Sequence, residues 1–135
     1  MRVVLLKPEL NEETKDCDMT PKIREIDESD FLMMQFCKLL DCAVYQTKRV
    51  VVEGHPYDLF FDSKSPYNHK IPSYCLPDGG IIHGNIIFAH CNGDEVLGVD
   101  DNDAFFLTIH LMQNVQRLST ALKEARRFGK DIGIF

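Results

Sequence analysis

The sequence predicts an α+β fold in which a mostly antiparallel sheet packs against two helices, the second a long C-terminal helix. Three observations carry this prediction. Short runs of β-branched and aromatic residues, separated by turn residues, recur through the first hundred positions. The Asn92-Gly93 pair is typical of a tight antiparallel hairpin. Leucines spaced three and four residues apart, starting at Leu107, indicate a long amphipathic helix.

The first quarter of the chain predicts two strands and one short helix. Residues 2–6 form an apolar run that indicates a strand, and residues 22–26 alternate polar and apolar side chains as a half-buried strand does. The segment 9–20 between them is acidic, and we expect a solvated loop or arm. A helix with Ser29 as its N-cap is expected to run to about Asp41.

The middle of the chain predicts short strands around a long polar loop. Residues 43–45 and 49–52 indicate two strands joined through residues 46–48, and residues 57–61 indicate another. The segment 62–72 carries two prolines and an asparagine among polar residues, so we expect an irregular central loop there.

The last part of the chain predicts a hairpin and the long helix. Residues 81–90 are rich in β-branched side chains and indicate one continuous strand, which the Asn-Gly turn joins to a strand at 96–99. The C-terminal helix is expected at 102–128. Its first half is apolar nearly all round, so we expect burial there, including the side chains of Phe105, Phe106, Ile109 and Met112.

Composition limits the function classes. The chain has 135 residues, 44% of them apolar and 27% charged, which suits a single domain over residues 1–135. The formal net charge of -6 argues against direct nucleic-acid binding or attachment to an anionic membrane, since both need a cationic face. No apolar run approaches the about 18 residues that a membrane-spanning helix needs.

The cysteines indicate a reducing compartment. Their number is odd, no CxxC pair occurs, and no signal peptide precedes them, so we expect free thiols and a cytoplasmic protein. The five cysteines are Cys17, Cys37, Cys42, Cys75 and Cys91.

Several short motifs recur in a recognisable order along the chain. They are the run Asp58-Leu59-Phe60-Phe61-Asp62-Ser63-Lys64, the Ile71-Pro72 step, the strand 81–88 and the Asn-Gly turn. In this order they resemble a family of small proteins, DUF3846. The resemblance covers about residues 1 to 110, and the motifs that carry it are short. Ser73-Tyr74 departs from the Asn-Arg pair common after that proline, and the C-terminal helix is longer. The resemblance implies a phage, plasmid or other mobile-element setting, and it implies no catalytic residues.

Familiar catalytic and metal-binding motifs are absent from the sequence. No P-loop, GxGxxG, GxSxG or HExxH pattern occurs, and no cofactor or metal is expected. His83 and His90, seven apart on the expected strand, would point to opposite faces and share no metal with Cys75 or Cys91. These absences favour binding over catalysis. One catalytic alternative stays open, in which the protein is an enzyme whose nucleophile is Cys75 or Cys91, with His55, His69 or His110 as its base.

The central loop is the candidate for a small anionic ligand such as a nucleotide. It gathers cationic, aromatic and hydrogen-bonding side chains, and Gly84 allows a ligand to approach the backbone closely. A solvated loop with proline-set turns is the alternative. The candidate ligand-binding residues are Lys64, Tyr67, Asn68, His69, Lys70, His83 and Asn85.

Acidic residues are the candidates for contact with a partner protein. Two acidic stretches, one of which contains no basic residue between positions 94 and 103, would suit a cationic partner surface, although such runs also serve solubility. The candidate residues are Glu9, Glu12, Glu13, Asp94, Glu95, Asp100, Asp101 and Asp103. The stripe of Leu118, Leu122 and Ala125 is either core or the contact of a homodimer.

The leading functional hypothesis is therefore a non-enzymatic protein of a phage or mobile element that engages and inhibits a host protein. The host protein would be a defence or nucleic-acid-processing factor. The alternatives are a module that binds or sequesters a nucleotide-like small molecule and the cysteine-dependent enzyme.

Overall fold

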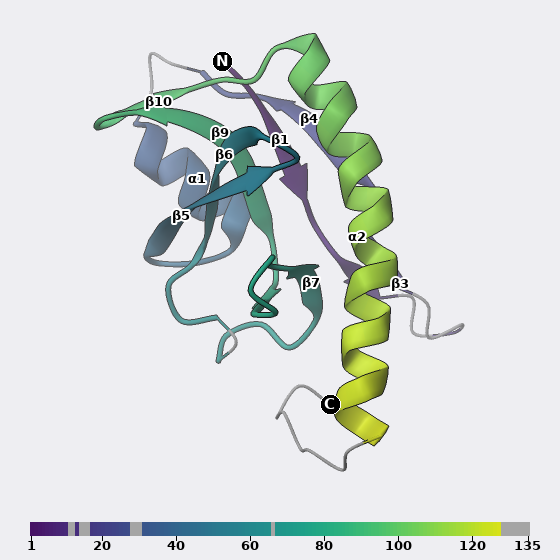
Figure 1. Ribbon diagram of the computed structural model, residues 1–135. Helices are drawn as coiled ribbons and strands as arrows, with labels where there is room; N and C mark the ends of the chain where they lie inside the picture. Colours follow the sequence, from purple (N-terminus) through teal and green to yellow (C-terminus); the bar gives the residue numbers. More distant parts are fainter. Residues whose placement is uncertain (11–12, 14–16, 28–30, 66, 128–135) are drawn as a thin grey trace.

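The fold is a six-stranded antiparallel sheet with one helix on each face, which confirms the predicted α+β class. Figure 1 shows the computed structural model, in which the long helix α2 runs along one side of the sheet and α1 lies on the other. The structure describes residues 1–10, 13, 17–27, 31–65 and 67–127, with side chains left out at 10, 17, 18 and 121–127.

The central strands of the sheet are β1, β9 and β6. The strand order is β4-β1-β9-β6-β5, and β10 also pairs with β9 beyond the end of its ladder with β1. The bounds are β1 Arg2–Leu6, β4 Pro21–Glu25, β5 Tyr45–Val52, β6 His55–Asp62, β9 Ile86–Asn92, β10 Glu95–Leu97, α1 Leu32–Leu40 and α2 Asp101–Arg127.

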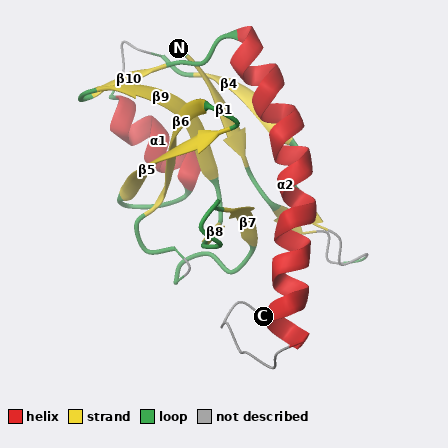
Figure 2. Cartoon of the chain, viewed as in Figure 1, coloured by secondary structure: helices red, strands yellow, loops and turns green. Residues whose placement is uncertain are grey.

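Two small ladders lie outside the main sheet (Figure 2). In the acidic segment 9–20, β2 (Glu9–Leu10) pairs with β3 (Cys17–Asp18), so the expected loop contains a short hairpin. The second ladder joins β7 (Pro72–Cys75) to β8 (Ile81–His83). The described residues between β6 and β7 form turns and bends, as expected for the central loop.

The sheet has a hydrophobic core on each face because successive side chains of a strand point to opposite sides. In β1, Val3 and Leu5 pack with α1, whereas Val4 and Leu6 pack beneath α2. The same alternation places Phe60 on the α1 side and Leu59 on the α2 side. All four apolar residues of this short first strand are therefore buried.

Helix α1 is held by aromatic packing. The ring of Phe36 lies 5.0 Å from that of Phe60 and 5.9 Å from that of Tyr45. The N-cap is Phe31, which makes no side-chain cap hydrogen bond, so the prediction of Ser29 as N-cap is wrong; Ser29 itself lies outside the described residues. The helix begins later because packing of its apolar side, rather than a cap, defines it.

Helix α2 begins with two reciprocal backbone–side-chain hydrogen bonds. The Asp103 N–H donates to Asp100 Oδ1 at 2.7 Å, and the Asp100 N–H donates to Asp103 Oδ2 at 3.3 Å. This capping box sets the first helical residue at Asp101, one position before the predicted start at 102.

Burial of α2 differs from the prediction. Phe105 is 71% exposed and Met112 66%, and Ile109 is exposed as well, so the expected burial of the first half all round is wrong. The buried side chains lie along one side at Ala104, Leu107, Leu111, Asn114 and Leu118. Leu118, only 2% exposed, is core and offers no surface for a homodimer; the side chains of Leu122 and Ala125 lie outside the description.

Two strand predictions are corrected. Residues 45–52 form one strand, because Gln46, Thr47 and Lys48 continue the ladder to β6 and the edge position leaves their side chains in solvent. The expected strand 81–90 is interrupted at Gly84, whose φ of +84° lies in the left-handed region. The hairpin at Asn92-Gly93 is confirmed, with β10 paired from 95 to 97.

Candidate functional site

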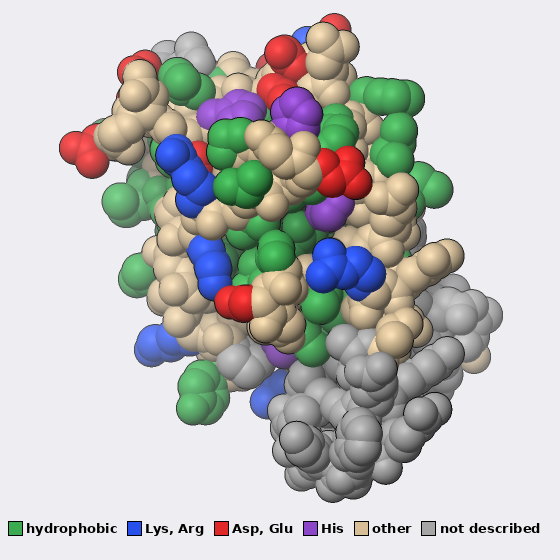
Figure 3. Space-filling model, viewed as in Figure 1, with side chains coloured by type: hydrophobic (Ala, Val, Ile, Leu, Met, Phe, Trp, Pro, Cys, Tyr) green, Lys and Arg blue, Asp and Glu red, His purple; other side chains and the backbone are tan. Residues whose placement is uncertain are grey.

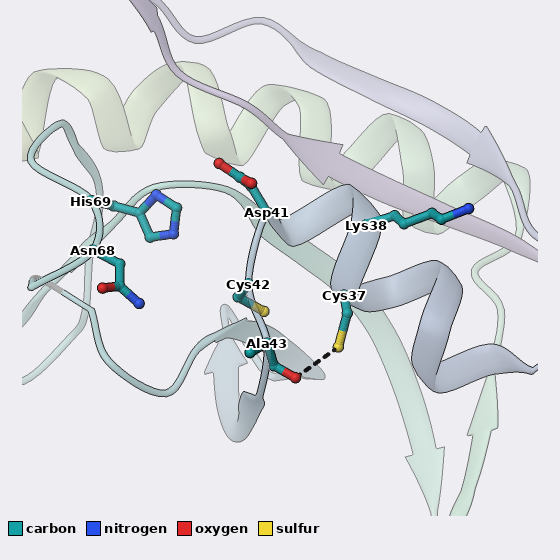
Figure 4. Close-up of a pocket in the computed structure, with 7 residues that line it drawn as sticks. All are labelled: Cys37, Lys38, Asp41, Cys42, Ala43, Asn68 and His69. Carbon is teal, nitrogen blue, oxygen red and sulfur yellow. Dashed lines mark hydrogen bonds between the residues drawn. The ribbon is translucent and has the colours of Figure 1, made fainter.

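The candidate site is a pair of adjoining hollows at the C-terminal end of α1. One has a volume of about 750 Å³ and is lined by Cys37, Cys42, Asn68 and neighbouring residues (Figure 4). The other, of about 440 Å³, lies between α1, the end of β1 and β4. Both are lined by Lys38, Asp41 and His69, which join them into one surface groove.

The carboxylate of Asp62 organises the loop that forms one wall of this groove. Asp62 ends β6 and is 2% exposed. It accepts hydrogen bonds from the Lys64 N–H at 2.9 Å, the Asn68 amide at 3.0 Å and His69 Nε2 at 3.0 Å. The central loop is therefore folded around a buried acid, in contrast to a freely solvated segment.

The protonation of this acid follows from its contacts. Burial by itself raises the pKa of Asp62, but the hydrogen bonds from Lys64, Asn68 and His69 outweigh it and the net shift lowers that pKa. The carboxylate is thus ionised at neutral pH and accepts a hydrogen bond from the Nε2–H of His69. Asp62 fixes the orientation of the imidazole in the groove.

Gly84 is the second determinant of the His69 position. A Cβ at residue 84 would lie 2.5 Å from Cγ of His69, so the imidazole occupies the space that a side chain would need. The neighbouring Asn85 donates from Nδ2 to the Leu39 carbonyl at 2.8 Å and ties the end of α1 to the start of β9. The strand interruption at Gly84 therefore makes room for the His69 ring that lines the groove.

Cations from distant segments of the sequence line the smaller hollow. Lys7 follows β1, Arg24 lies on β4, and Lys38 lies on the last turn of α1. The antiparallel register pairs Arg24 with Val3, which faces α1, so Arg24 points to that same side. Asp41 is the acidic residue among the groove-lining side chains.

The structure brings three of the predicted ligand-binding residues together. Asn68, His69 and Asn85 line the groove, whereas Lys64, Tyr67 and Lys70 line neither hollow. Lys7, Arg24 and Lys38 were not among the predicted residues, because nothing in the local sequence joins them. The alternation of Lys22 and Arg24 opposite an apolar strand is the one signal that could have indicated a cationic strand face.

His83 is 3% exposed and does not reach the groove surface. Neither of its ring nitrogens has a hydrogen-bond partner within the described structure. Burial lowers the pKa of His83, and the charge of Lys70 lowers it further, so the ring is neutral at pH 7. The backbone of His83 is instead held by Ser65, whose hydroxyl donates to the His83 carbonyl at 3.0 Å.

The predicted partner-binding acids are dispersed. Asp100 and Asp103 cap α2, Asp101 bonds Arg2, and Glu9 lies 3.9 Å from Lys7. Asp94 and Glu95 lie at the exposed tip of the β9–β10 hairpin, Glu13 is exposed, and Glu12 lies outside the described residues. Acidic side chains occur at several separate places on the face in Figure 3.

The cysteine hypothesis gains no geometric support. Burial, with smaller effects from Cys37 and Asp62, raises the pKa of Cys42 to about 12, so its thiol is protonated at neutral pH. Burial and the charge of Asp58 also raise the pKa of Cys91. Cys75 is buried and its backbone is bonded by Asn114. In the described part of the chain, neither Cys75 nor Cys91 is hydrogen-bonded to a histidine.

No group of three or more His, Cys, Asp or Glu that could hold a metal ion occurs among the described residues. His83 and His90 belong to separate strands, and His90 bonds Asp103 at 3.1 Å. The described helices include none with the length and apolarity to cross a membrane. Comparison with protein-family models, curated proteins and solved structures yielded no match.

Proposed function

We propose that this protein is a non-enzymatic binding module that engages a partner protein through the outer face of α2. The observation that carries the proposal is the exposure of Phe105, Ile109 and Met112 on a helix whose opposite side forms the core. Apolar side chains project from the outer side of α2 at the upper right of Figure 3. Large exposed apolar side chains gathered on one element mark interaction surfaces in soluble proteins.

The spacing of these residues defines the partner. Positions 105, 109 and 112 are separated by four and three residues, so they lie on one side of the helix and fit an apolar groove. Asp101 lies one turn earlier on the same side, and its carboxylate is paired with Arg2. The apolar side chains therefore define the contact, and the partner is expected to present an apolar groove.

The resemblance to DUF3846 supports a more specific version. In a mobile-element setting, the partner of a small non-enzymatic protein would be a protein of the host, and occupation of its groove would inhibit it. A defence or nucleic-acid-processing factor fits best, because such proteins present cationic surfaces that the net charge of -6 would complement.

Site-specific photo-crosslinking tests this proposal. A photoreactive phenylalanine analogue replaces Phe105 in one protein and Tyr67, an 83% exposed aromatic on the central loop, in a matched control. We expect one host protein to crosslink from position 105 and not from position 67. With that protein purified, the substitutions Phe105→Ser and Met112→Ser together should weaken binding about 30-fold or more, as loss of an interface hot spot does.

Three outcomes would contradict the proposal. Equal crosslinking from position 67, or unchanged affinity of the double variant, would remove α2 as the contact. The third concerns self-association, measured by light scattering on the protein alone. A dimer that the Phe105→Ser change converts to monomer would show that a second copy occupies this face.

A further inference from the structure

We propose that the hollow between β1, β4 and the C-terminal part of α1 binds a small phosphorylated molecule. This site lies on the α1 side of the sheet, opposite the core face covered by α2. It is independent of the partner surface on α2 and adds a second, small-molecule binding activity.

Local charge is the first argument. Lys7, Arg24 and Lys38 line one hollow in a protein whose formal net charge is -6, so the cations gather there against the overall composition. In the described part of the chain, no carboxylate pairs with Arg24 or Lys38, and Lys7 Nζ lies 3.9 Å from Glu9 in a half-exposed contact. Such exposed pairs contribute little, so Lys7 stays available to a ligand.

Shape is the second argument. A volume of about 440 Å³ falls within the range typical of small-molecule sites. One wall is rigid, because His69 is bonded to Asp62 and packed on Gly84, and Asn85 is bonded to Leu39. The lining also carries the flexible cations, so a ligand would be oriented by the fixed polar side chains and neutralised by the cations.

The types of cation indicate the ligand. A guanidinium presents a planar fork of N–H donors that matches phosphate oxygens in pairs, and an ammonium acts as a point charge beside it. Arg24 with Lys7 and Lys38 could therefore neutralise a phosphate monoester, whose charge approaches -2 at neutral pH. Asp41, the acid in the lining, opposes this anion and should limit affinity.

Lys38 must move to complete the site. Figure 4 shows its side chain extended along α1, away from His69. Its flexible chain allows the ammonium to approach a ligand, at a cost in rotamer entropy. We therefore expect Lys7 and Arg24 to dominate the affinity and Lys38 to contribute less.

The test titrates the full chain with adenosine monophosphate and, separately, with inorganic phosphate, each against sodium chloride at equal ionic strength. Binding is followed by amide chemical shifts in NMR spectra. Saturable shifts at residues of β1, β4 and the α1 C-terminus support the proposal; shifts with both probes indicate that the phosphate alone suffices. Arg24→Gln and Lys7→Gln should each raise Kd about tenfold, the value of one lost charged hydrogen bond.

The variant Asp41→Asn provides the opposite change. Asp41 has a left-handed φ of 53°, which asparagine also adopts, so the fold is retained while the acid is removed. We expect this variant to bind the probe several-fold more tightly. The matched control is Lys64→Gln with Lys70→Gln, which removes two cations of the central loop outside the hollow and should leave Kd unchanged.

The proposal is overturned if neither probe produces saturable shifts up to about 10 mM, a concentration that would detect even binding of millimolar Kd. It is also overturned if the Lys64→Gln/Lys70→Gln control loses binding as strongly as Arg24→Gln. Crosslinking from position 105 is measured without phosphate. A negative phosphate titration therefore does not contradict the partner surface on α2, and negative crosslinking does not contradict the phosphate site.

Discussion

The two helices cover opposite faces of one sheet and are held there by different forces. Helix α1 has nine residues, lacks a side-chain N-cap and rests on an aromatic cluster around Phe36. Helix α2 has 27 residues and is fixed by polar contacts as well as by leucines. Asp103 joins it to Tyr57 and His90, His110 to Tyr74, and Asn114 to the backbone of Cys75.

The difference explains which apolar residues remain exposed. Hydrophobic packing is non-directional, and apolar residues surround the first half of α2. Packing alone would therefore allow several rotations of the helix about its axis, each with a different side against the sheet. Hydrogen bonds need specific partners at fixed distances. The contacts of Asp103, His110 and Asn114 place their side of α2 against the sheet and leave Phe105 and Met112 outside.

The largest effect is expected from truncation of the α1 anchor. Phe36 is fully buried between Tyr45 and Phe60, so Phe36→Ala should destabilise the protein by about 3–5 kcal/mol through lost burial and the cavity left behind. Phe105→Ala removes the same atoms from an exposed site and should change the free energy of unfolding by less than about 0.5 kcal/mol. Urea denaturation measures both; equal losses would contradict the two-sided description of α2.

A smaller effect is expected from loss of the amide that holds β7 to α2. Asn114 is buried, and its side chain bonds both the N–H and the carbonyl of Cys75 at 2.9 Å. Asn114→Ala should cost about 1–3 kcal/mol, because it leaves the N–H and the carbonyl of Cys75 without this partner. Gln113→Ala on the exposed neighbouring position is the control, and similar values for the two variants in urea denaturation would show that packing alone holds α2.

The smallest effect is expected from the charge of Asp103, and it depends on pH. Burial raises its pKa, but hydrogen bonds from His90, Tyr57 and Asp100 outweigh burial and lower it below the ordinary 3.8. A lowered folded pKa gives stability that is present above pH 3.8 and lost as pH falls towards the folded value. Asp103→Asn should therefore cost about 1 kcal/mol at pH 7 and progressively less as the pH falls below 3.8.

Thermal unfolding measured between pH 7 and pH 2.5 checks this prediction. The wild type and Asp103→Asn should converge as the pH falls, whereas Asp94→Asn at the exposed hairpin tip should follow the wild type throughout. A constant gap between wild type and Asp103→Asn would mean that the carboxylate charge contributes nothing to holding the start of α2.

Local patterns predicted most of the elements. The apolar run 2–6, the alternating segment 22–26, the Asn-Gly turn and the leucine spacing of α2 each carry their structure within a few residues. The errors lie where tertiary contacts override a local preference. Gly84 interrupts a β-branched run so that His69 can pack on it, and edge pairing extends β5 through polar residues.

The candidate site was predicted only in part for the same reason. Asn68 and His69 lie in one polar segment, and Asn85 follows the glycine that allows close approach to the backbone, so local sequence indicated all three. Lys7, Arg24 and Lys38 come from three separate elements, and only the register of β1 with β4 and the position of α1 bring them to one hollow.

The sequence by itself determined the α+β class, the hairpin, the long final helix and the apolar strands, because periodicity and turn chemistry act between near neighbours. Only the tertiary structure decided which side of α2 is buried, which backbone groups the Asn114 side chain bonds, and which cations meet beside α1. Those outcomes depend on strand register and on hydrogen-bond partners 13 to 46 residues apart, which no local pattern encodes.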